Sequence, residues 1–92
     1  MSYEILFGKA ADRDLGRLSP DVQRCIVSHV AALTDSPRPQ GAEPLHGRLR
    51  GLMKLRVGHY RISYEIDDEE RLTIVMEIGR RWDIYRRLER RR

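Results

Sequence analysis

The pattern of apolar and polar residues changes about halfway along the chain. In the first half a short apolar run, residues 3–7, precedes two stretches in which apolar residues recur every three or four positions, roughly 9–18 and 20–34. That spacing is typical of one buried face of an α-helix. Ser19-Pro20 predicts the start of the second helix, since serine is a preferred N-cap and proline suits the first helical position. We therefore expect a short strand followed by a hairpin of two helices with one apolar face.

From Leu52 onward apolar and polar residues alternate instead, which is typical of half-buried strands. Two alternating runs flank Gly58-His59, and glycine in the first position of a two-residue loop favours a type II′ hairpin. An acidic turn separates this hairpin from a third apolar run, which ends at a glycine. The elements expected in this half are strands over residues 52–57, 60–66 and 72–78, followed by a turn and a short helix over 80–88.

The hairpin register follows from keeping one side of the sheet apolar. The register that does so pairs Val57 with Tyr60, Leu55 with Ile62 and Met53 with Tyr64, and continues into the third strand with the pairs Tyr64–Ile74 and Ile62–Met76. The other side of the hairpin then carries Lys54, Arg56 and Arg61, with the two arginines directly opposite each other. A slip of one residue would move every side chain to the wrong side of the sheet. The alternation therefore predicts a cationic face behind the apolar one.

This cationic face predicts a bound anion. Like charges directly opposite each other on a sheet are destabilising, and an anion between Arg56 and Arg61 would reverse the sign of that interaction. The alternative is an ordinary cross-strand ion pair, because the register of the third strand sets Glu77 across from Arg61. One glutamate cannot also neutralise Lys54 and Arg56, so we expect an anion-binding face.

In the order β-α-α-β-β-β-α these elements predict an α+β fold, a small antiparallel sheet with the helical hairpin packed on one face. The helices would cover the apolar side and leave the cationic face open. Ninety-two residues provide one hydrophobic core, so we treat residues 1–92 as a single domain.

Charge is distributed unevenly along the chain. Residues 1–45 carry five Lys/Arg and six Asp/Glu, a net charge of −1, whereas residues 46–92 carry thirteen and eight, a net charge of +5. A basic half of this kind favours a phosphate-rich or acidic partner. The sequence has no signal-peptide pattern and no apolar stretch of membrane-spanning length, so we expect a cytoplasmic protein with no membrane contact. The single cysteine, Cys25, fits a reducing compartment, and its apolar neighbours predict a small core side chain, with a reactive nucleophile as the alternative.

The end of the chain adds two arginines and an aromatic residue. Arg80 and Arg81 follow the third strand of this half, and Tyr85 lies four residues after Arg81. Guanidinium groups grip phosphate through two parallel hydrogen bonds, and an aromatic ring stacks on an unpaired base. On the alternative interpretation Trp82, Ile84 and Tyr85 only pack the tail helix. The pattern predicts a surface that holds single-stranded RNA.

Two segments resemble the RelE/ParE family of toxins. MKLRVGHYRISYEID, residues 53–67, is similar to the family's hairpin, and IGRRWDIY, residues 78–85, is similar to its closing strand and tail. The preceding strand and helices, with Ser36-Pro37-Arg38 after the second helix, agree with it as well, so the resemblance covers nearly the whole chain. The RelE branch is the most similar; its members cleave mRNA in the ribosomal A site and are held inactive by an antitoxin.

The resemblance implies a role for each matching residue. The implied catalytic residues are Lys54, which helps to activate the ribose 2′-hydroxyl, Arg61, which grips the scissile phosphate, Arg81, which stabilises the leaving 5′-oxygen, and Tyr85, which stacks on a base. The implied RNA-binding residues are Arg56 and Arg80, and we add Arg48 and Arg50 from the basic loop before the hairpin. Two positions depart from the family's pattern: Leu52 stands where many members have a second lysine, and the stretch from Arg81 to Tyr85 is two residues shorter.

The resemblance also implies a mechanism and partners. The chain would be a type II toxin and a ribosome-dependent endoribonuclease that uses no metal or other cofactor and leaves a 2′,3′-cyclic phosphate. The sequence shows no Asp/Glu/His cluster with metal-ligand spacing and no His/Glu pair placed for acid–base catalysis. The site would then act by positioning and charge stabilisation on RNA that the ribosome holds rigidly. The expected partners are a RelB-like antitoxin, the ribosome with its mRNA, and operator DNA bound by the toxin–antitoxin complex.

Two other functions stay open on the sequence. The first is a ParE-like toxin that inhibits DNA gyrase without nuclease activity; such relatives generally lack the combination of Lys54, Arg61, Arg81 and Tyr85. The second is a non-catalytic protein- or RNA-binding module whose basic face serves only assembly. A phosphate gripped by two hydrogen bonds would not tolerate Arg61→Lys, whereas a surface that only supplies charge would.

Overall fold

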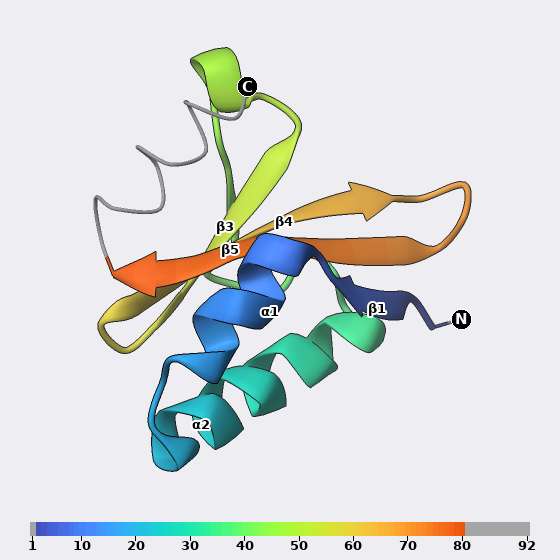
Figure 1. Ribbon diagram of the computed structural model, residues 1–92. Helices are drawn as coiled ribbons and strands as arrows, with labels where there is room; N and C mark the ends of the chain where they lie inside the picture. Colours follow the sequence, from blue (N-terminus) through green and yellow to red (C-terminus); the bar gives the residue numbers. More distant parts are fainter. Residues whose placement is uncertain (1, 81–92) are drawn as a thin grey trace.

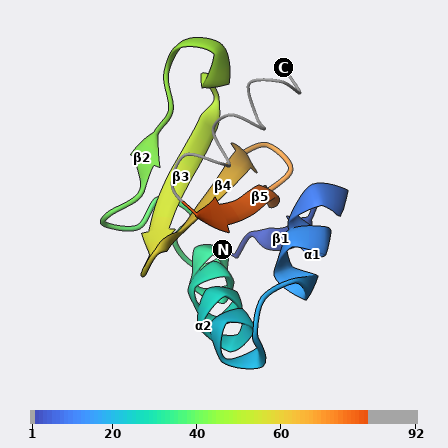
Figure 2. The ribbon, with the colours of Figure 1, turned by 60° about the vertical axis from the view of Figure 1, so that its left-hand side comes forward.

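Five strands form one sheet in a computed structural model that describes residues 2–80 (Figure 1). The elements are β1 (Glu4–Phe7), α1 (Lys9–Gly16), α2 (Pro20–Ala31), the 3-10 turn η1 (Ala32–Thr34), β2 (Glu43–Pro44), the 3-10 turn η2 (Gly47–Leu49), β3 (Leu52–Val57), β4 (Tyr60–Asp67) and β5 (Leu72–Arg80). The strand order is β1-β5-β4-β3-β2. The two helices lie together on one side of the sheet, as the view in Figure 2 shows. The predicted α+β fold with a helical hairpin on one face is therefore confirmed.

The sheet differs from the expectation at both edges. β1 runs parallel to β5, from Glu4 beside Leu72 to Phe7 beside Val75, so the sheet is mixed and not antiparallel throughout. At the other edge the two-residue strand β2 pairs with β3, an element that the sequence analysis did not include. β5 continues through Arg80, and the rest of the expected helix over 80–88 lies outside the described residues.

The helical hairpin begins and turns as its sequence predicts. Ser19 is the N-cap of α2, where its hydroxyl accepts a hydrogen bond from the Val22 N–H at 3.5 Å. The side-chain amide of Gln23 donates to the carbonyls of Leu15 and Leu18, at 2.9 and 3.0 Å. These carbonyls lie at and just after the end of α1, where the last turn leaves acceptor capacity that side chains can use. One side chain of α2 therefore links the start of this helix to the end of α1.

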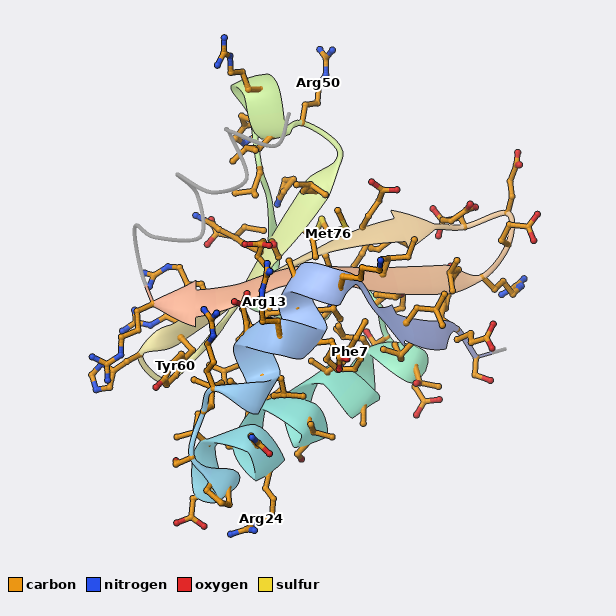
Figure 3. All side chains as sticks on the ribbon, viewed as in Figure 1. Phe7, Arg13, Arg24, Arg50, Tyr60 and Met76 are labelled. Atoms are coloured by element: carbon orange, nitrogen blue, oxygen red, sulfur yellow. The ribbon has the colours of Figure 1, made fainter. Side chains whose placement is uncertain are left out.

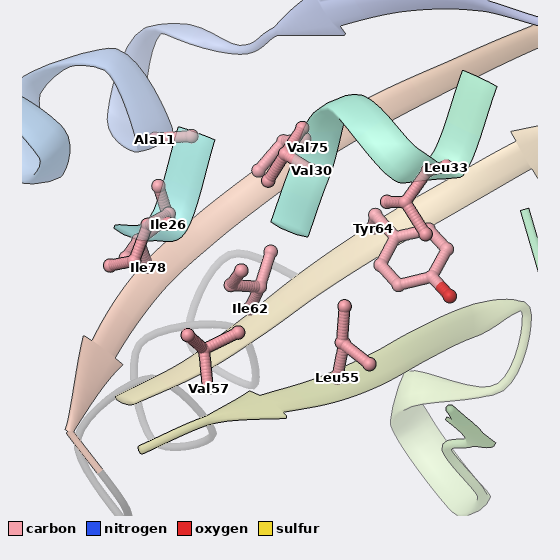
Figure 4. Packing of buried hydrophobic residues seen from close by; sticks show 10 residues of the cluster. All are labelled: Ala11, Ile26, Val30, Leu33, Leu55, Val57, Ile62, Tyr64, Val75 and Ile78. Carbon is pink, nitrogen blue, oxygen red and sulfur yellow. The ribbon is translucent and has the colours of Figure 1, made fainter. Parts of the chain in front are cut away.

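The main core lies between the helices and the sheet (Figure 4). Its buried members are Ala11, Ile26, Val30, Leu33, Leu55, Val57, Ile62, Tyr64, Val75 and Ile78. The Tyr64 hydroxyl donates to the Pro37 carbonyl at 2.8 Å, and burial raises the pKa of Tyr64 to about 12. The ring thus fills the core while its one polar atom stays paired, which is how a buried tyrosine is accommodated.

The apolar stripe of α2 is narrower than predicted. Ile26, Val30 and Leu33 are buried, whereas Cys25 is exposed, so the prediction that this cysteine packs in the core is wrong. His29, one turn later, is exposed too, and its Nδ1 lies 2.8 Å from the Cys25 carbonyl oxygen. Only one row of α2 side chains reaches the core, because α1 occupies the space beside it over β5.

Candidate active site on the open face of the sheet

The three cations of the hairpin gather at one cavity. Lys54 and Arg56 come from β3 and Arg61 from β4, and they line a cavity of about 130 Å³ together with Gly41, Glu43 and Leu55. The observed register is the predicted one, with Arg56 opposite Arg61 and Lys54 opposite Ser63. Neither helix contributes a lining residue, and Arg56 is exposed. The prediction that these side chains share one uncovered face is confirmed.

The hairpin turn fixes this arrangement. Gly58 has a φ of 61°, and its neighbour His59 is not in the left-handed region, as a type II′ turn requires. The Nε of Arg56 donates to the carbonyl of Gly58 at 3.2 Å. Because this bond uses one of the five guanidinium donors, the other four stay available. The turn therefore restrains the guanidinium without consuming its capacity to bind a ligand.

Within residues 2–80 the cavity's cations have no carboxylate in ion-pair contact. The two ion pairs in this part of the chain are Arg24–Asp21 and Arg38–Asp68, and both lie elsewhere. Two guanidinium groups that face each other without a counter-ion destabilise the sheet by a few tenths of a kcal/mol or more. An anion in the cavity would remove that cost and would meet donors arranged as two forks.

Glu77 is not the cross-strand partner of Arg61. A β-bulge between Ser63 and Tyr64 shifts the β4–β5 register, so Arg61 pairs with Gly79 and Glu77 pairs with Ser63. The expected pairs Tyr64–Ile74 and Ile62–Met76 are wrong: Tyr64 faces Val75, a shift of one residue, and Ile62 faces Ile78, a shift of two, so the bulge accounts for one residue of the difference. Glu77 is 1% exposed and takes part in interactions of its own. Arg61 therefore has a glycine on one side and Arg56 on the other.

A glutamate that sequence reasoning missed lines the same cavity. Glu43 in β2 is the register partner of Lys54, and it is the one acidic residue among the cavity's described lining residues. Its strand is only two residues long, too short to show an alternation. The available signal was indirect: an isolated acidic residue before Pro44, in a segment that must reach the edge of a sheet.

Leu52 shares the open face but belongs to a second apolar cluster. It is 1% exposed and packs with Leu49, against Leu45 and Met76. Leu49 belongs to η2, so the loop before β3 folds over this part of the sheet. The open face is thus cationic at the hairpin end and apolar where the η2 loop covers it.

Three of the expected RNA-binding arginines do not line the cavity: Arg48, Arg50 and Arg80. Arg48 and Arg50 are exposed in and after η2, and Figure 3 shows Arg50 on the loop that projects beyond the sheet. Arg80 is the register partner of Tyr60, and its guanidinium carbon stands 5.5 Å from the centre of that ring. Tyr60 packs on the helix-side core, so Arg80 turns to the face opposite Arg61. Binding of RNA by these three arginines stays a prediction.

Arg81 and Tyr85, the other two expected catalytic residues, lie outside the described residues. Among residues 2–80, no three His, Cys, Asp or Glu side chains come together in an arrangement that could hold a metal ion. Neither of the two helices in this range is long and apolar enough to span a bilayer.

Comparison with known proteins identifies several toxins that this chain is similar to. A family model described as the ParE toxin of type II toxin–antitoxin systems matches residues 5–85. Toxin RelG of Mycobacterium tuberculosis is 36% identical over 88 residues, which are 95% of this chain and all of RelG. Toxin RelE of the same organism is 35% identical over 85 residues, 91% of this chain and 87% of that protein.

Solved structures agree with the fold. A chain of the toxin–antitoxin complex RelBE2 from M. tuberculosis superposes with a TM-score of 0.80 at 30% identity, covering 88% of this chain and 100% of the other. Isolated E. coli RelE superposes with a TM-score of 0.74 at 22% identity, covering 98% of each chain, and at that identity supports the fold alone. From the family match over residues 5–85 and the identity to two toxins, we conclude that this chain belongs to the RelE/ParE family of toxins of type II toxin–antitoxin systems.

Proposed function

We propose that this toxin is a ribosome-dependent endoribonuclease that cleaves mRNA by attack of a ribose 2′-hydroxyl on the adjacent phosphate. The observation that carries the proposal is the cavity in which Lys54, Arg56 and Arg61 meet with no carboxylate in ion-pair contact within the described residues. Similarity to toxins named RelG and RelE supports it, and no observation favours gyrase as the target.

The chemistry of the cavity suits a phosphodiester. Negative charge grows on the non-bridging oxygens as the 2′-oxygen attacks, and preorganised cationic donors stabilise that charge. Arg61 would grip the scissile phosphate, with Arg56 beside it and Lys54 toward the attacking hydroxyl. These groups supply the positive charge that a metal would otherwise provide, so we propose a metal-independent reaction. Arg81 and Tyr85 complete the proposed site, on the leaving oxygen and on a base.

Dependence on the ribosome follows from what these residues lack. Arginine is a poor proton donor and acceptor, because its guanidinium group stays protonated in proteins. A site built from such groups relies on holding the substrate, and positioning alone contributes roughly 7–11 kcal/mol. The ribosome would present the codon in a fixed geometry, and a toxin that acts there would work in the cytoplasm.

We further propose a RelB-like antitoxin as the partner. The relative of known structure at 30% identity is described as part of a toxin–antitoxin complex. The basic half of the chain, with its uncompensated cavity, suits an acidic or extended segment of a second protein. By the same analogy the complex would bind its operator DNA.

The test is cleavage of a defined mRNA on programmed ribosomes by the purified toxin. We expect new 5′ ends within the A-site codon, fragments that end in a 2′,3′-cyclic phosphate, and little cutting of the same RNA free in solution. Arg61→Lys should lower the rate at least about 100-fold, because lysine cannot form the two parallel bonds of a guanidinium and one lost donor costs that much. Arg24→Lys, on the exposed surface of α2, is the matched control and should cleave normally (Figure 3).

Two results would contradict the proposal. Normal cleavage by Arg61→Lys would show that the cavity only supplies charge. Intact mRNA together with DNA damage on expression of the toxin would indicate gyrase as its target instead.

A further inference from the structure

The two edges of β5 are held by different elements. On one edge β5 pairs with β4 from Leu72 to Arg80. On the other edge β1 pairs only with the segment from Leu72 to Val75, because the chain leaves the sheet at Gly8 and enters α1. Residues 76–80 are therefore the part of β5 that has no neighbouring strand on this outer edge among the described residues.

Helix α1 lies over β5 where β1 ends (Figure 1). The Gly8 N–H donates to the Val75 carbonyl at 2.9 Å, and the chain turns so close to β5 that a Cβ at Gly8 would stand 3.2 Å from this oxygen. Further along α1 the carboxylate of Asp14, which is 6% exposed, accepts a hydrogen bond from the Ile78 N–H at 3.0 Å. A side chain of the helix thus supplies an acceptor that a neighbouring strand would otherwise supply.

The β-bulge decides which N–H points to this outer edge. β5 has one extra residue there, Met76. In a regular strand the backbone groups that point to one edge recur at every second residue, so Glu77 would follow Val75. The bulge moves this place to Ile78, whose N–H meets Asp14. The carboxylate therefore holds β5 in its bulged register.

The end of β5 leads into the proposed site. Gly79 pairs with Arg61, the residue proposed to grip the scissile phosphate, and β5 ends at Arg80. Arg81, proposed to act on the leaving oxygen, is the next residue in the sequence. Two groups that act on one phosphate must keep their separation, since a misplacement of about 1 Å can cost on the order of 100-fold in rate. The path of residues 78–80 therefore matters for the reaction.

We infer that Asp14 is a positioning residue for the proposed reaction, an inference that rests on the proposed ribonuclease function. Its carboxylate holds the outer edge of β5 at Ile78, so that Arg81 acts on the same phosphate that Arg61 grips. Asp14 belongs to α1 and does not line the cavity, so it acts through the strand and not on the RNA.

The test is a double-mutant cycle in single-turnover cleavage on programmed ribosomes. Asp14→Ala should cleave about 10–100-fold more slowly than the wild type at saturating ribosome, with the half-saturating concentration unchanged. In an Arg81→Ala background the same change should slow cleavage by less than about threefold, because the side chain that it positions is gone. In an Arg56→Ala background the change should keep its full effect.

Other variants separate positioning from folding. Asp14→Asn should recover most of the rate, because its amide oxygen can accept the bond from Ile78. Asp12→Ala, on the exposed side of the same helix, is the matched control and should cleave at the wild-type rate. In Asp14→Ala the Ile78 amide should exchange its hydrogen faster, whereas the amide of Ile62 in the core stays protected. If Asp14→Ala does not fold, Asp14→Ser takes its place in the cycle.

Three outcomes would overturn the inference while leaving the proposed function in place. Cleavage by Asp14→Ala within about threefold of wild type would mean that the end of β5 needs no such support, since misplacement is far more costly. An equal loss in the wild-type and Arg81→Ala backgrounds would mean that Asp14 only stabilises the fold. Asp14→Asn as slow as Asp14→Ala would mean that the bond to Ile78 does not carry the effect. If the wild-type toxin does not cleave mRNA on the ribosome, the proposed function itself fails, and this inference fails with it.

Discussion

Charged side chains at the two ends of β4 differ in whether they are paired. Near its start Arg61 faces Arg56 on one side and Gly79 on the other, with no counter-ion among the described residues. Just beyond its end Asp68 accepts two hydrogen bonds from Arg38, at 2.9 and 3.2 Å, and one from the Tyr3 hydroxyl at 2.6 Å. One strand therefore connects a cluster of cations without an ion-pair partner among the described residues to an aspartate that is paired with an arginine.

The contrast indicates what each end does. The chain has fourteen Asp and Glu residues. A shortage of acidic residues therefore does not explain why the cations of the cavity have no ion-pair partner among the described residues. At the far end Asp68 joins three separate segments: the N-terminus through Tyr3, the loop after α2 through Arg38, and the β4–β5 turn itself. Paired charges join segments of the fold there, whereas the cations of the proposed site have no ion-pair partner among the described residues.

The largest expected effect comes from removing the uncompensated charge. Arg61→Thr should abolish cleavage by about 100-fold or more, because the phosphate loses a charged donor. The same change should raise the free energy of unfolding by a few tenths of a kcal/mol, since it removes a like-charge pair and places a β-branched residue in a strand. Urea titration and the ribosome assay on one preparation would measure both.

The opposite outcome would be informative as well. If Arg61→Thr is less stable than the wild type, the two arginines do not repel each other appreciably in the free protein. The cavity would then be an ordinary solvated surface, and the comparison of the two ends would lose its meaning.

The hairpin end could be predicted from sequence, because two signals agree there. Strict alternation specifies which residues face the core, and Gly58-His59 fixes the register. The β4–β5 register could not be predicted in the same way. Ile74, Val75 and Met76 are three consecutive apolar residues, so the pattern does not show where a bulge reverses the alternation.

Strand pairing at the two edges of the sheet could not be predicted from the sequence for a different reason. Neither the parallel pairing of β1 with β5 nor the two-residue β2 leaves a pattern in the sequence, since both depend on where distant segments meet. Cys25 was misplaced because an apolar stripe on a helix does not reveal how much of its width the neighbouring helix leaves free. Glu43, the acid in the cavity, was missed together with its strand.

A second, smaller effect is expected behind the cavity, on the helix side of β5. Asp14 of α1 is buried, and its Oδ2 accepts a hydrogen bond from the Ile78 N–H at 3.0 Å. Ile78 pairs with Ile62, directly beside Arg61. Asp14→Ala should lower the free energy of unfolding by about 1–3 kcal/mol, the cost of leaving a buried donor without its acceptor.

Asp12→Ala, on the exposed side of the same helix, is the matched control for Asp14→Ala and should cost less than the buried change, as measured by urea denaturation at neutral pH. Equal losses for the two variants would mean that helix propensity, and not the bond to Ile78, accounts for the effect. The cavity end would then owe its stability to packing alone.

The smallest effect is expected at the paired end, where exposure weakens each interaction. The hydrogen bonds from Arg38 and Tyr3 hold the pKa of Asp68 at about 2, below the ordinary value of 3.8. Because the pKa is lower in the folded protein than in the unfolded chain, the pairing stabilises the fold fully above pH 4 and loses its effect as the pH falls from about 4 to about 2. Asp68→Asn should therefore be less stable than the wild type at pH 6, and the difference should shrink as the pH approaches 2.

Urea titrations at intervals across this range would measure the difference in stability. Asp35→Asn, whose side chain makes no described hydrogen bond, is the control. A difference that stays constant with pH would show that Asp68 acts through the shape of the turn and not through its charge, and the two ends of β4 would then differ in geometry only.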